Sequence, residues 1–331
     1  TLHNMNIVII GTGYVGLVTG VGLASLGNFV NFIDLDENKI KDLSSKKITF
    51  YEPGLEEYFN DEETFKRMSF SSDYASIEWD NIDIVFVCVQ TPNNIETNSV
   101  DTKFLESAIK EINNVNNNDL VITVKSTIPP YEIEKVCEKV GMDSSKLTFN
   151  PEFLREGTAV EDFFKPDRIV LGGTDSEKLT KLKELYSGFD CEIITTDSIS
   201  SQLIKYLANT YLPLRLSFVN EATRLIDYSG GNLDDVLKGV GLDNRIGQHY
   251  FRPSPSWGGS CFPKDLVEVN NFYDKDKLNL PLISNIINSN DIHADWTSEN
   301  IKELYESKKL EGVVLIGAAF KEDTDDLRNS P

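Results

Sequence analysis

This sequence contains few cysteines and fewer basic than acidic residues. The four cysteines, Cys88, Cys137, Cys191 and Cys261, are widely spaced and form no CxxC pair. We therefore expect the protein to reside in a reducing cytoplasm. We expect it to have no disulfide framework and no zinc or other metal site. The 32 basic residues face 53 acidic ones, and the formal net charge of −21 argues against nucleic acid or an anionic membrane surface as a partner.

Long apolar runs and a targeting segment are also lacking. No stretch of about 18 uncharged apolar residues occurs, so no membrane span is expected. The opening residues, TLHNMNIVII, lack the basic segment and cleavage site of a secretory signal. With 40% hydrophobic and 26% charged residues the composition is that of a globular protein, and a length of 331 residues predicts two or three domains.

Short apolar runs alternate with helix-forming stretches over residues 1–197. Several runs are apolar at every position, as expected for strands that are buried on both faces. We therefore predict an α/β fold that begins with a Rossmann-type, doubly wound parallel sheet. The expected strands are Asn6–Ile10, Val30–Asp34, Ile84–Val89, Leu120–Lys125, Leu147–Asn150, Ile169–Gly172 and Glu192–Thr195.

The pattern changes near Asp197. A long amphipathic helix is predicted from Ser200 to about Tyr228, with a kink at Pro213, and further helices follow, so residues 198–297 are expected to form an all-helical central domain. An apolar strand, VVLIGAAF, is predicted from Val313. Because a lone parallel strand cannot bury itself, we expect residues 298–331 to begin a truncated C-terminal Rossmann-like domain.

The motif GTGYVG follows the first expected strand and precedes a helix-forming run. Gly11 permits a tight turn, Gly13 lets a pyrophosphate approach the backbone, and Gly16 lets helix and strand pack closely. Asp34 ends the next expected strand, where its carboxylate can bind ribose hydroxyls and repel a 2′-phosphate. Lys39 could balance Asp34 or contact the ribose. The whole arrangement predicts a dinucleotide site that prefers NAD over NADP.

Small hydroxyl residues follow two more expected strands. Thr91 lies in VCVQTP and Thr127 in VKSTIPP. Ligands of open α/β sheets bind outside the carboxyl ends of the strands, but a plain turn explains either residue equally well.

Two polar pairs have the spacing of one helical turn. Glu152 and Glu156 in NPEFLREG could activate water or bind hydroxyls, and Lys205 and Asn209 could supply a cation and an orienting amide. When each pair is considered alone, a structural role explains it better than a catalytic one: a helix cap or a solvated side chain for the glutamates, and a surface pair for Lys205 and Asn209.

The segment GGSCFPKD carries the strongest chemical signal after the glycine motif. Glycines 258–259 give a loop that allows close approach, and Pro263 can start a helix directly after Cys261. A thiol at a helix N-terminus beside Lys264 is expected to have a depressed pKa, and Asp265 can steer a proton or the lysine. A buried structural role is commoner for cysteine, and it is what we expect of Cys88.

Seven motifs together resemble the UDP-glucose/GDP-mannose dehydrogenase family, over nearly the whole chain. They are GTGYVG, YEPGLEE, NPEFLREG, IKYLANTYL, NRIGQHYFRPS, GGSCFPKD and AFKEDTDDLRNSP. The resemblance implies an NAD-dependent, four-electron oxidation of a nucleotide sugar at C6, with UDP-glucose expected to become UDP-glucuronate. It also implies a homodimer built on the long helix, and a third domain that binds the nucleotide.

The resemblance also implies roles for individual residues. Cys261 would be the nucleophile; Lys205, Asn209 and Asp265 would stabilise oxyanions and order a water; Glu152, with Thr127 nearby, would serve the final hydrolysis. Cofactor contacts would come from Gly11, Gly13, Tyr14, Val15, Gly16, Asp34, Lys39, Thr91, Thr127, Glu156, Lys264 and Arg328. Substrate contacts would come from Glu152, Phe153, Leu154, Arg155, Glu156, Lys205, Asn209, Arg245, Tyr250, Phe251, Arg252, Pro253, Ser254, Gly258 and Lys321.

Three other functions remain open at this point. One is oxidation of a different nucleotide sugar, such as GDP-mannose or a UDP-N-acetylhexosamine. A second is a two-electron β-hydroxyacid dehydrogenase, which would need a lysine and an asparagine on the long helix but no cysteine. The third is an NAD-binding scaffold without catalysis. NADH formation from UDP-glucose compared with GDP-mannose tests the first. The number of NADH formed per sugar tests the second, and the effect of replacing Cys261 tests the third.

Overall fold

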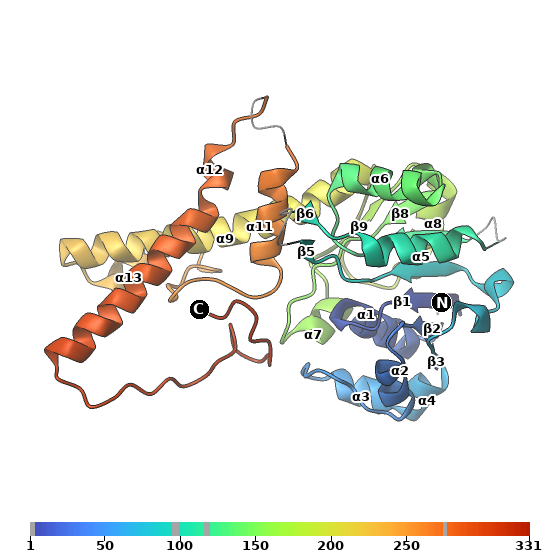
Figure 1. The fold of residues 1–331 in the computed structure, drawn as a ribbon, viewed down its shortest axis with the longest axis horizontal. Coiled ribbons are helices and arrows are strands. Elements are labelled where there is room, and N and C mark those ends of the chain that lie inside the picture. The colour runs from blue at the N-terminus through green and yellow to red at the C-terminus, as the bar shows by residue number, and fades with distance from the viewer. Residues whose placement is uncertain (1–3, 95–98, 116–119, 274–276) are drawn as a thin grey trace. The chain divides into compact units, whose positions relative to one another are not determined.

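The computed structural model describes residues 4–94, 99–115, 120–273 and 277–331. Figure 1 shows a sheet flanked by helices, followed along the chain by a helical part. The strands are β1 (Asn6–Ile10), β2 (Phe29–Ile33), β3 (Met68–Ser71), β4 (Ile84–Val87), β5 (Asn93–Asn94), β6 (Ser99–Val100), β7 (Val121–Val124), β8 (Leu147–Phe149), β9 (Arg168–Gly172) and β10 (Glu192–Thr196). The α-helices are α1 (Tyr14–Ser25), α2 (Glu37–Ser44), α3 (Leu55–Asn60), α4 (Glu62–Lys66), α5 (Lys103–Asn113), α6 (Pro130–Val140), α7 (Ala159–Phe164), α8 (Ser176–Leu185), α9 (Ser198–Ser229), α10 (Leu233–Gly241), α11 (Phe262–Asn271), α12 (Pro281–Ser284) and α13 (Ile286–Ser307).

Eight strands form the main sheet in the order β10-β9-β8-β7-β4-β1-β2-β3. The central strand β1 pairs in parallel with β2 on one side and with β4 on the other, which is where the strand order reverses. The strands from β8 through β3 all run in parallel, so the ends of β1, β4, β7 and β8 reach the same edge of the sheet. This edge is where α/β sheets bind ligands.

Successive side chains of β1 point to opposite faces of the sheet, and both faces are covered by helices. Ile7 and Ile9 point into one hydrophobic core, which α1, α3, α7 and α8 complete. Val8 and Ile10 point into a second core, which α5 and α6 complete. Because both faces of the strand are buried, every position from Ile7 to Ile10 must be apolar. The predicted doubly wound α/β fold is thereby confirmed.

The sequence analysis predicted a parallel sheet, but one pair of neighbouring strands is antiparallel. Strand β9 pairs antiparallel with β8 through Phe149 and Gly172, whereas β9 and β10 are parallel to each other. The chain leaves β8 and re-enters the sheet at the same edge, so the connection needs no crossover. The prediction also missed β3, a four-residue edge strand in which only Met68 is buried.

The strand predicted from Val313 is wrong for this structure. Residues 310–318 have no regular secondary structure, and the side chains of Val314, Leu315 and Ile316 are 84%, 83% and 92% exposed. A strand gains its stability from paired neighbours, and no other strand lies in the C-terminal compact unit of the described chain.

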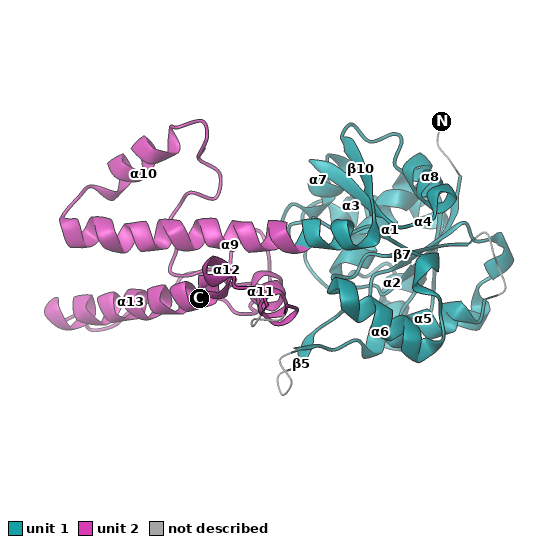
Figure 2. Ribbon diagram, turned by 90° about the horizontal axis from the view of Figure 1, so that it is seen from above, with its two compact units in different colours: residues 1–205 teal, residues 206–331 magenta. Residues whose placement is uncertain are grey.

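The chain divides into two compact units, residues 1–205 and 206–331 (Figure 2). The second unit is helical, and its apolar side chains gather in two small clusters around Val219 and Leu266. Helix α9 extends over 32 residues with Pro213 inside it, so the long helix is confirmed, and the kink at Pro213 stays a prediction. None of the helices in the described ranges combines the length and the apolar character needed to cross a bilayer.

Candidate active site

The predicted site residues fall into two groups, one in each compact unit. The first group begins at the glycine turn after β1, where Tyr14, Val15 and Gly16 open α1. Gly11 has φ of +97°, and a Cβ there would lie 2.6 Å from the Cys88 carbonyl oxygen. A Cβ on Gly16 would lie 1.9 Å from the Gly11 oxygen. Both positions therefore require glycine.

Gly13 differs from the other two glycines because nothing in the described chain lies within 4 Å of a Cβ built on it. It precedes the first helical residue of α1 and makes no side-chain cap. The turn thus leaves open space directly before the helix N-terminus, where a pyrophosphate binds in dinucleotide folds. This geometry fits the NAD that the sequence predicted.

Asp34 follows β2 and is held in a fixed position. Its Oδ2 accepts hydrogen bonds from the Thr12 amide (2.8 Å) and hydroxyl (2.7 Å), and Oδ1 accepts one from the Asp36 amide (3.0 Å). Lys39 Nζ lies 4.0 Å away. Burial raises the pKa of Asp34, but these hydrogen bonds outweigh it and the pKa lies below its ordinary value. The carboxylate is therefore ionised and oriented to accept hydroxyl donors.

The turns after β4 and β7 are joined by a hydrogen bond. Thr91 Oγ1 donates to the Thr127 carbonyl at 2.7 Å, so these two predicted residues lie next to each other. Lys125, which directly follows β7, is buried and donates to Asn150 Oδ1 at 3.0 Å. Burial lowers the pKa of Lys125 to about 8, against the opposing influence of Glu152.

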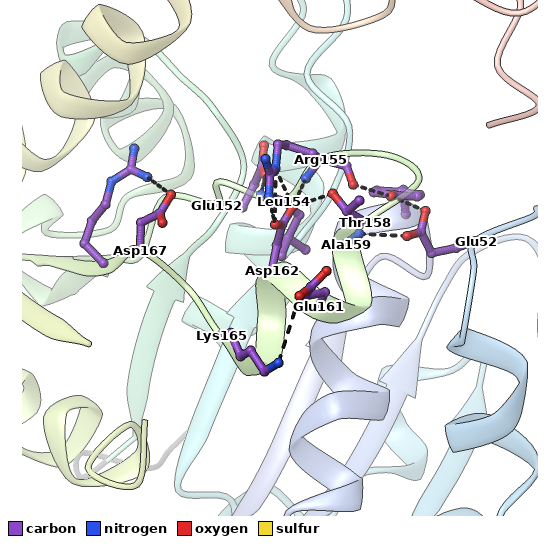
Figure 3. A network of polar contacts seen from close by, with 12 residues as sticks. Glu52, Glu152, Leu154, Arg155, Thr158, Ala159, Glu161, Asp162, Lys165 and Asp167 are labelled. Atoms are coloured by element: carbon purple, nitrogen blue, oxygen red, sulfur yellow. Dashed lines mark hydrogen bonds and ion pairs between the residues drawn. The ribbon is translucent and has the colours of Figure 1, made fainter. Parts of the chain in front are cut away.

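The loop after β8 carries a buried ion pair. Lys205 Nζ donates to Glu152 Oε1 at 2.8 Å, and Glu152 Oε2 accepts from the Leu154 amide at 2.8 Å. Both charged side chains are buried, so neither is the solvated surface group that the spacing alone favoured. Beside the pair, the guanidinium of Arg168 lies 3.7 Å from the ring centre of Phe153. Arg155 of the same loop forms an ion pair with Asp162 (Figure 3).

The second group begins at Cys261, the N-cap residue of α11. Its side chain is exposed, whereas Cys88 and Cys137 are buried, as the predicted structural role of Cys88 requires. Pro263 lies in the first turn of α11, so the predicted helix start is confirmed. The sequence therefore places one accessible thiol at a helix N-terminus.

A buried polar network lies one turn after the cysteine. Asn209 Nδ2 donates to Asp265 Oδ2 at 2.6 Å, and Lys264 Nζ lies 3.1 Å from Asp265 Oδ1 and 3.0 Å from Glu268 Oε1. Tyr206 donates its hydroxyl proton to Glu268. Burial alone would lower the pKa of Lys264, but the two carboxylates outweigh it and raise the pKa. Burial raises the pKa of Glu268 to about 7.

The C-terminal segment packs against the glycines before Cys261. A Cβ on Gly258 would lie 1.8 Å from the Asn329 carbonyl oxygen, and one on Gly259, where φ is +86°, would lie 2.8 Å from the Phe320 ring. Asn329 Nδ2 also donates to the Gly259 carbonyl at 3.0 Å. Both glycines are required because another backbone and an aromatic ring occupy the space of their side chains.

Side chains of two helices, α9 and α13, bind the backbone of residues 254–257, which we call loop 254–257. Asn220 of α9 accepts from the Ser254 amide at 3.0 Å, and His293 Nε2 of α13 donates to the Ser254 carbonyl at 2.8 Å. Asn290 accepts from the Trp257 amide and donates to the Trp257 carbonyl, both at 2.9 Å. These contacts fix the path of the chain toward Cys261.

The remaining predicted residues occupy varied positions. Phe251 is buried in the cluster around Val219, and Tyr250 has a left-handed backbone with φ of +54°. Arg252 and Pro253 are exposed. Arg245 and Arg328 form ion pairs at 2.7 Å with Asp243 and Asp326, and Lys321 Nζ lies 5.9 Å from the Phe320 ring centre.

Several polar residues of these groups were not predicted. Glu268 could have been found from its spacing, because it lies one helical turn after Lys264. Glu52 lies in the quoted motif YEPGLEE, but the motif gave it no role. Asn290 and His293 carry no signal in the sequence, since they bind the backbone of a distant loop.

Comparison with known proteins places the chain in a family. Residues 5–190 match the NAD binding domain, and residues 199–292 the central domain, of the UDP-glucose/GDP-mannose dehydrogenase family. The chain is 37% identical to "UDP-glucose 6-dehydrogenase" of Rickettsia felis, over 99% of this chain and 74% of that protein.

Solved structures agree with this assignment. A UDP-glucose dehydrogenase from Pyrobaculum islandicum matches with a TM-score of 0.87 and 34% identity, over 99% of this chain and 78% of that one. A GDP-mannose dehydrogenase from Pseudomonas aeruginosa matches with a TM-score of 0.68 and 29% identity, over 98% of this chain and 76% of that one. The protein with this glycine turn, ionised Asp34 and cysteine-bearing helix belongs to the UDP-glucose/GDP-mannose dehydrogenase family of NAD-dependent nucleotide-sugar oxidoreductases.

Proposed function

We propose that this protein oxidises UDP-glucose at C6 to UDP-glucuronate with two molecules of NAD+, through a thiohemiacetal and a thioester on Cys261. The observation that carries the proposal is the exposed Cys261 at the start of α11, one turn from the buried Asp265–Asn209 pair. The relatives named UDP-glucose 6-dehydrogenase, which match nearly the whole chain, support the same substrate.

The residues that would hold the cofactor are those of the first group. The open space at Gly13 would accept the pyrophosphate, and the ionised Asp34 would accept the ribose hydroxyls. Thr91, Thr127 and Lys39 complete the proposed contacts. Bound NAD+ supplies the hydride acceptor for both oxidations.

A covalent step explains how one site could oxidise the same carbon twice. The first oxidation converts the C6 alcohol to an aldehyde, and Cys261 Sγ then forms a bond to the aldehyde carbon as the carbonyl oxygen takes up a proton. The thiohemiacetal keeps one hydrogen on that carbon, so a second oxidation gives a thioester. Water then adds, the C–S bond breaks, and a carboxylate and the free thiol are released.

The charged residues would serve the oxygen that becomes negative in these steps. We assign oxyanion stabilisation and water ordering to Lys205, Asn209 and Asp265, and the hydrolysis to Glu152 with Thr127 nearby. A positioned donor to an oxyanion typically contributes about 10²–10³ in rate. The buried pairs Lys205–Glu152 and Asn209–Asp265 support these roles, because pairing keeps each group in one orientation.

Cys261→Ser tests the covalent mechanism in the full chain. We expect loss of steady-state UDP-glucuronate formation with binding of NAD+ and UDP-glucose retained, while the wild type forms two NADH per sugar. Cys191→Ser is the matched control, because this partly buried thiol lies outside both groups. Normal acid formation by Cys261→Ser would exclude the covalent step, and one NADH per sugar would indicate a two-electron dehydrogenase.

The choice of sugar nucleotide is tested by comparing substrates. UDP-glucose is expected to give faster NADH formation than GDP-mannose or a UDP-N-acetylhexosamine. The GDP-mannose dehydrogenase from Pseudomonas aeruginosa keeps the second substrate under consideration, at 29% identity. Faster turnover of GDP-mannose would replace the proposed substrate without affecting the proposed chemistry.

We further propose a homodimer built on α9 in a reducing cytoplasm, where a catalytic thiol stays reduced. Leu207, Tyr211, Phe218 and Leu225 are each more than half exposed and recur at helical spacing along α9. A Phe218→Glu variant is expected to halve the mass measured by light scattering. An unchanged mass for this variant would argue against α9 as the interface.

We also propose the domain organisation 1–197, 198–297 and 298–331, with the last segment beginning a nucleotide-sugar-binding domain. The exposed apolar run at Val313–Ile316 supports this, because such a run usually pairs with further strands. Joining to residue 331 the part of the Rickettsia felis relative that lies beyond the match would test it: protease resistance of residues 313–320 should rise.

A further inference from the structure

The motif YEPGLEE has no role in the reaction proposed above, although it contains a deeply buried carboxylate. Glu52 is only 5% exposed. Burying a charged carboxylate costs free energy unless donors surround it, so its position calls for an explanation. The turn that presents it is built by Pro53 and by Gly54, whose φ is +79°.

Three hydrogen bonds surround the carboxylate, and Figure 3 shows the one from Ala159. Oε2 accepts the hydroxyl proton of Tyr14 at 2.5 Å and the amide proton of Gly157 at 2.7 Å. Oε1 accepts the amide proton of Ala159 at 2.7 Å. Hydrogen bonds to a charged acceptor are among the stronger ones in proteins. Glu52 thus binds two segments that lie more than a hundred residues apart.

The two segments are those that carry the first group of site residues. Tyr14 is the first residue of α1, directly after the glycine turn. Gly157 belongs to the connection between β8 and α7, which also carries Glu152 and Glu156, and Ala159 is the first residue of α7. This connection has little regular structure over residues 150–158, so its backbone amides need acceptors from elsewhere in the fold.

We propose that Glu52 is a positioning residue that fixes the loop 152–158 against helix α1, and so holds the Glu152 and Glu156 carboxylates in register with the glycine turn. The consequence for catalysis rests on the function proposed above, whereas the fixation of the loop does not. Glu52 itself touches neither the thiol nor the carboxylate of Glu152 in the contacts described. It acts through Tyr14, Gly157 and Ala159.

Glu52→Gln separates positioning from mere packing because it preserves volume. The amide retains one oxygen, but its NH2 group faces a backbone N–H, so one of the three hydrogen bonds is lost. Glu161→Gln is the matched control: this carboxylate lies on α7, two residues after Ala159, but is 67% exposed and only 4.0 Å from Lys165. Tyr14→Phe is a second, milder variant that removes one donor and leaves the two amides paired.

Amide hydrogen exchange of the full chain gives a readout that is independent of activity. In Glu52→Gln we expect exchange of residues 151–160 to accelerate at least tenfold, while exchange of β1 stays at the wild-type rate. Tyr14→Phe should accelerate it less, because it removes one donor while both backbone amides keep the carboxylate as acceptor. Glu161→Gln should leave exchange unchanged.

Steady-state kinetics with UDP-glucose then tests the consequence for catalysis. Glu52→Gln is expected to lower kcat by roughly 10- to 100-fold with a smaller change in KM, since misplacing a reacting group slows the chemical step. A variant destabilised only globally would show faster exchange in β1 as well, and this would overturn the proposal. So would wild-type exchange and kcat in Glu52→Gln, or in Tyr14→Phe should the first variant not fold. If the wild type does not oxidise UDP-glucose, the proposed function fails, and the exchange rates still decide whether Glu52 fixes the loop.

Discussion

The buried Glu268 makes a prediction about the pH dependence of stability. Burial raises its pKa to about 7 from an ordinary value of 4.5, against the opposing charge of Lys264 at 3.0 Å. The folded protein therefore binds this proton more tightly than the unfolded chain. The resulting stability is fully present below pH 4.5 and is lost as the pH rises through about 7.

The size of the effect follows from the two pKa values. Their separation corresponds to a contribution of about 3 kcal/mol to the free energy of unfolding, lost between pH 4.5 and the region above pH 7. Glu268→Gln removes the titrating group, while the amide oxygen can still accept the hydroxyl proton of Tyr206. The wild type is thus expected to lose about 3 kcal/mol more than the variant over this range.

Urea denaturation at a series of pH values, followed by fluorescence, measures this difference. Trp257 is buried in the same compact unit and reports on its unfolding. Glu303→Gln, an exposed position on α13, is the control and should follow the wild type. Identical pH dependence in the wild type and Glu268→Gln would refute the reasoning, since Glu268 would then titrate alike in the folded and unfolded states.

Three further predictions concern the two groups of site residues. Lys205→Met leaves Glu152 buried without its cation and should destabilise the first compact unit by about 3–5 kcal/mol in urea denaturation. The double variant with Glu152→Gln should recover much of this stability, and purely additive costs of the two substitutions would contradict a buried pair. Gly258→Ala places a methyl group 1.8 Å from the Asn329 carbonyl oxygen, so at least tenfold slower turnover with little loss of NAD+ binding is expected, and wild-type kinetics would show that the C-terminal segment moves aside at no cost. Asp34→Ala should weaken NAD+ binding more than NADP+ binding in calorimetry, whereas an equal effect on both would argue against the ribose contact.

Much of the fold was predictable because its signals are local. The apolar runs of β1, β4 and β7 reflect burial on both faces, and GTGYVG specifies the turn after β1. The direction of β9 was not predictable, because it depends on the path of the irregular connection before it. The strand expected from Val313 failed for a similar reason: an apolar sequence supplies the propensity for a strand, but pairing requires a neighbour.

The chemistry of the site was predictable only in part. Cys261 and Asp34 carry their signal in adjacent residues, namely glycines, a proline and a preceding strand. The burial of Glu152 with Lys205 could not be derived, because these residues are 53 positions apart and each alone reads as a surface charge. Asn290 remained unpredicted because it binds backbone atoms, and backbone atoms leave no pattern in the sequence.

The way loop 254–257 is held has a consequence for evolution. Asn220, Asn290 and His293 bind its amide and carbonyl groups. The Ser254 hydroxyl donates within the loop, to the Ser256 carbonyl at 3.0 Å. A scaffold that recognises backbone tolerates different side chains at the positions it holds. Substitutions at the exposed neighbours Arg252 and Pro253 can therefore accumulate over generations while the loop keeps its path to Cys261.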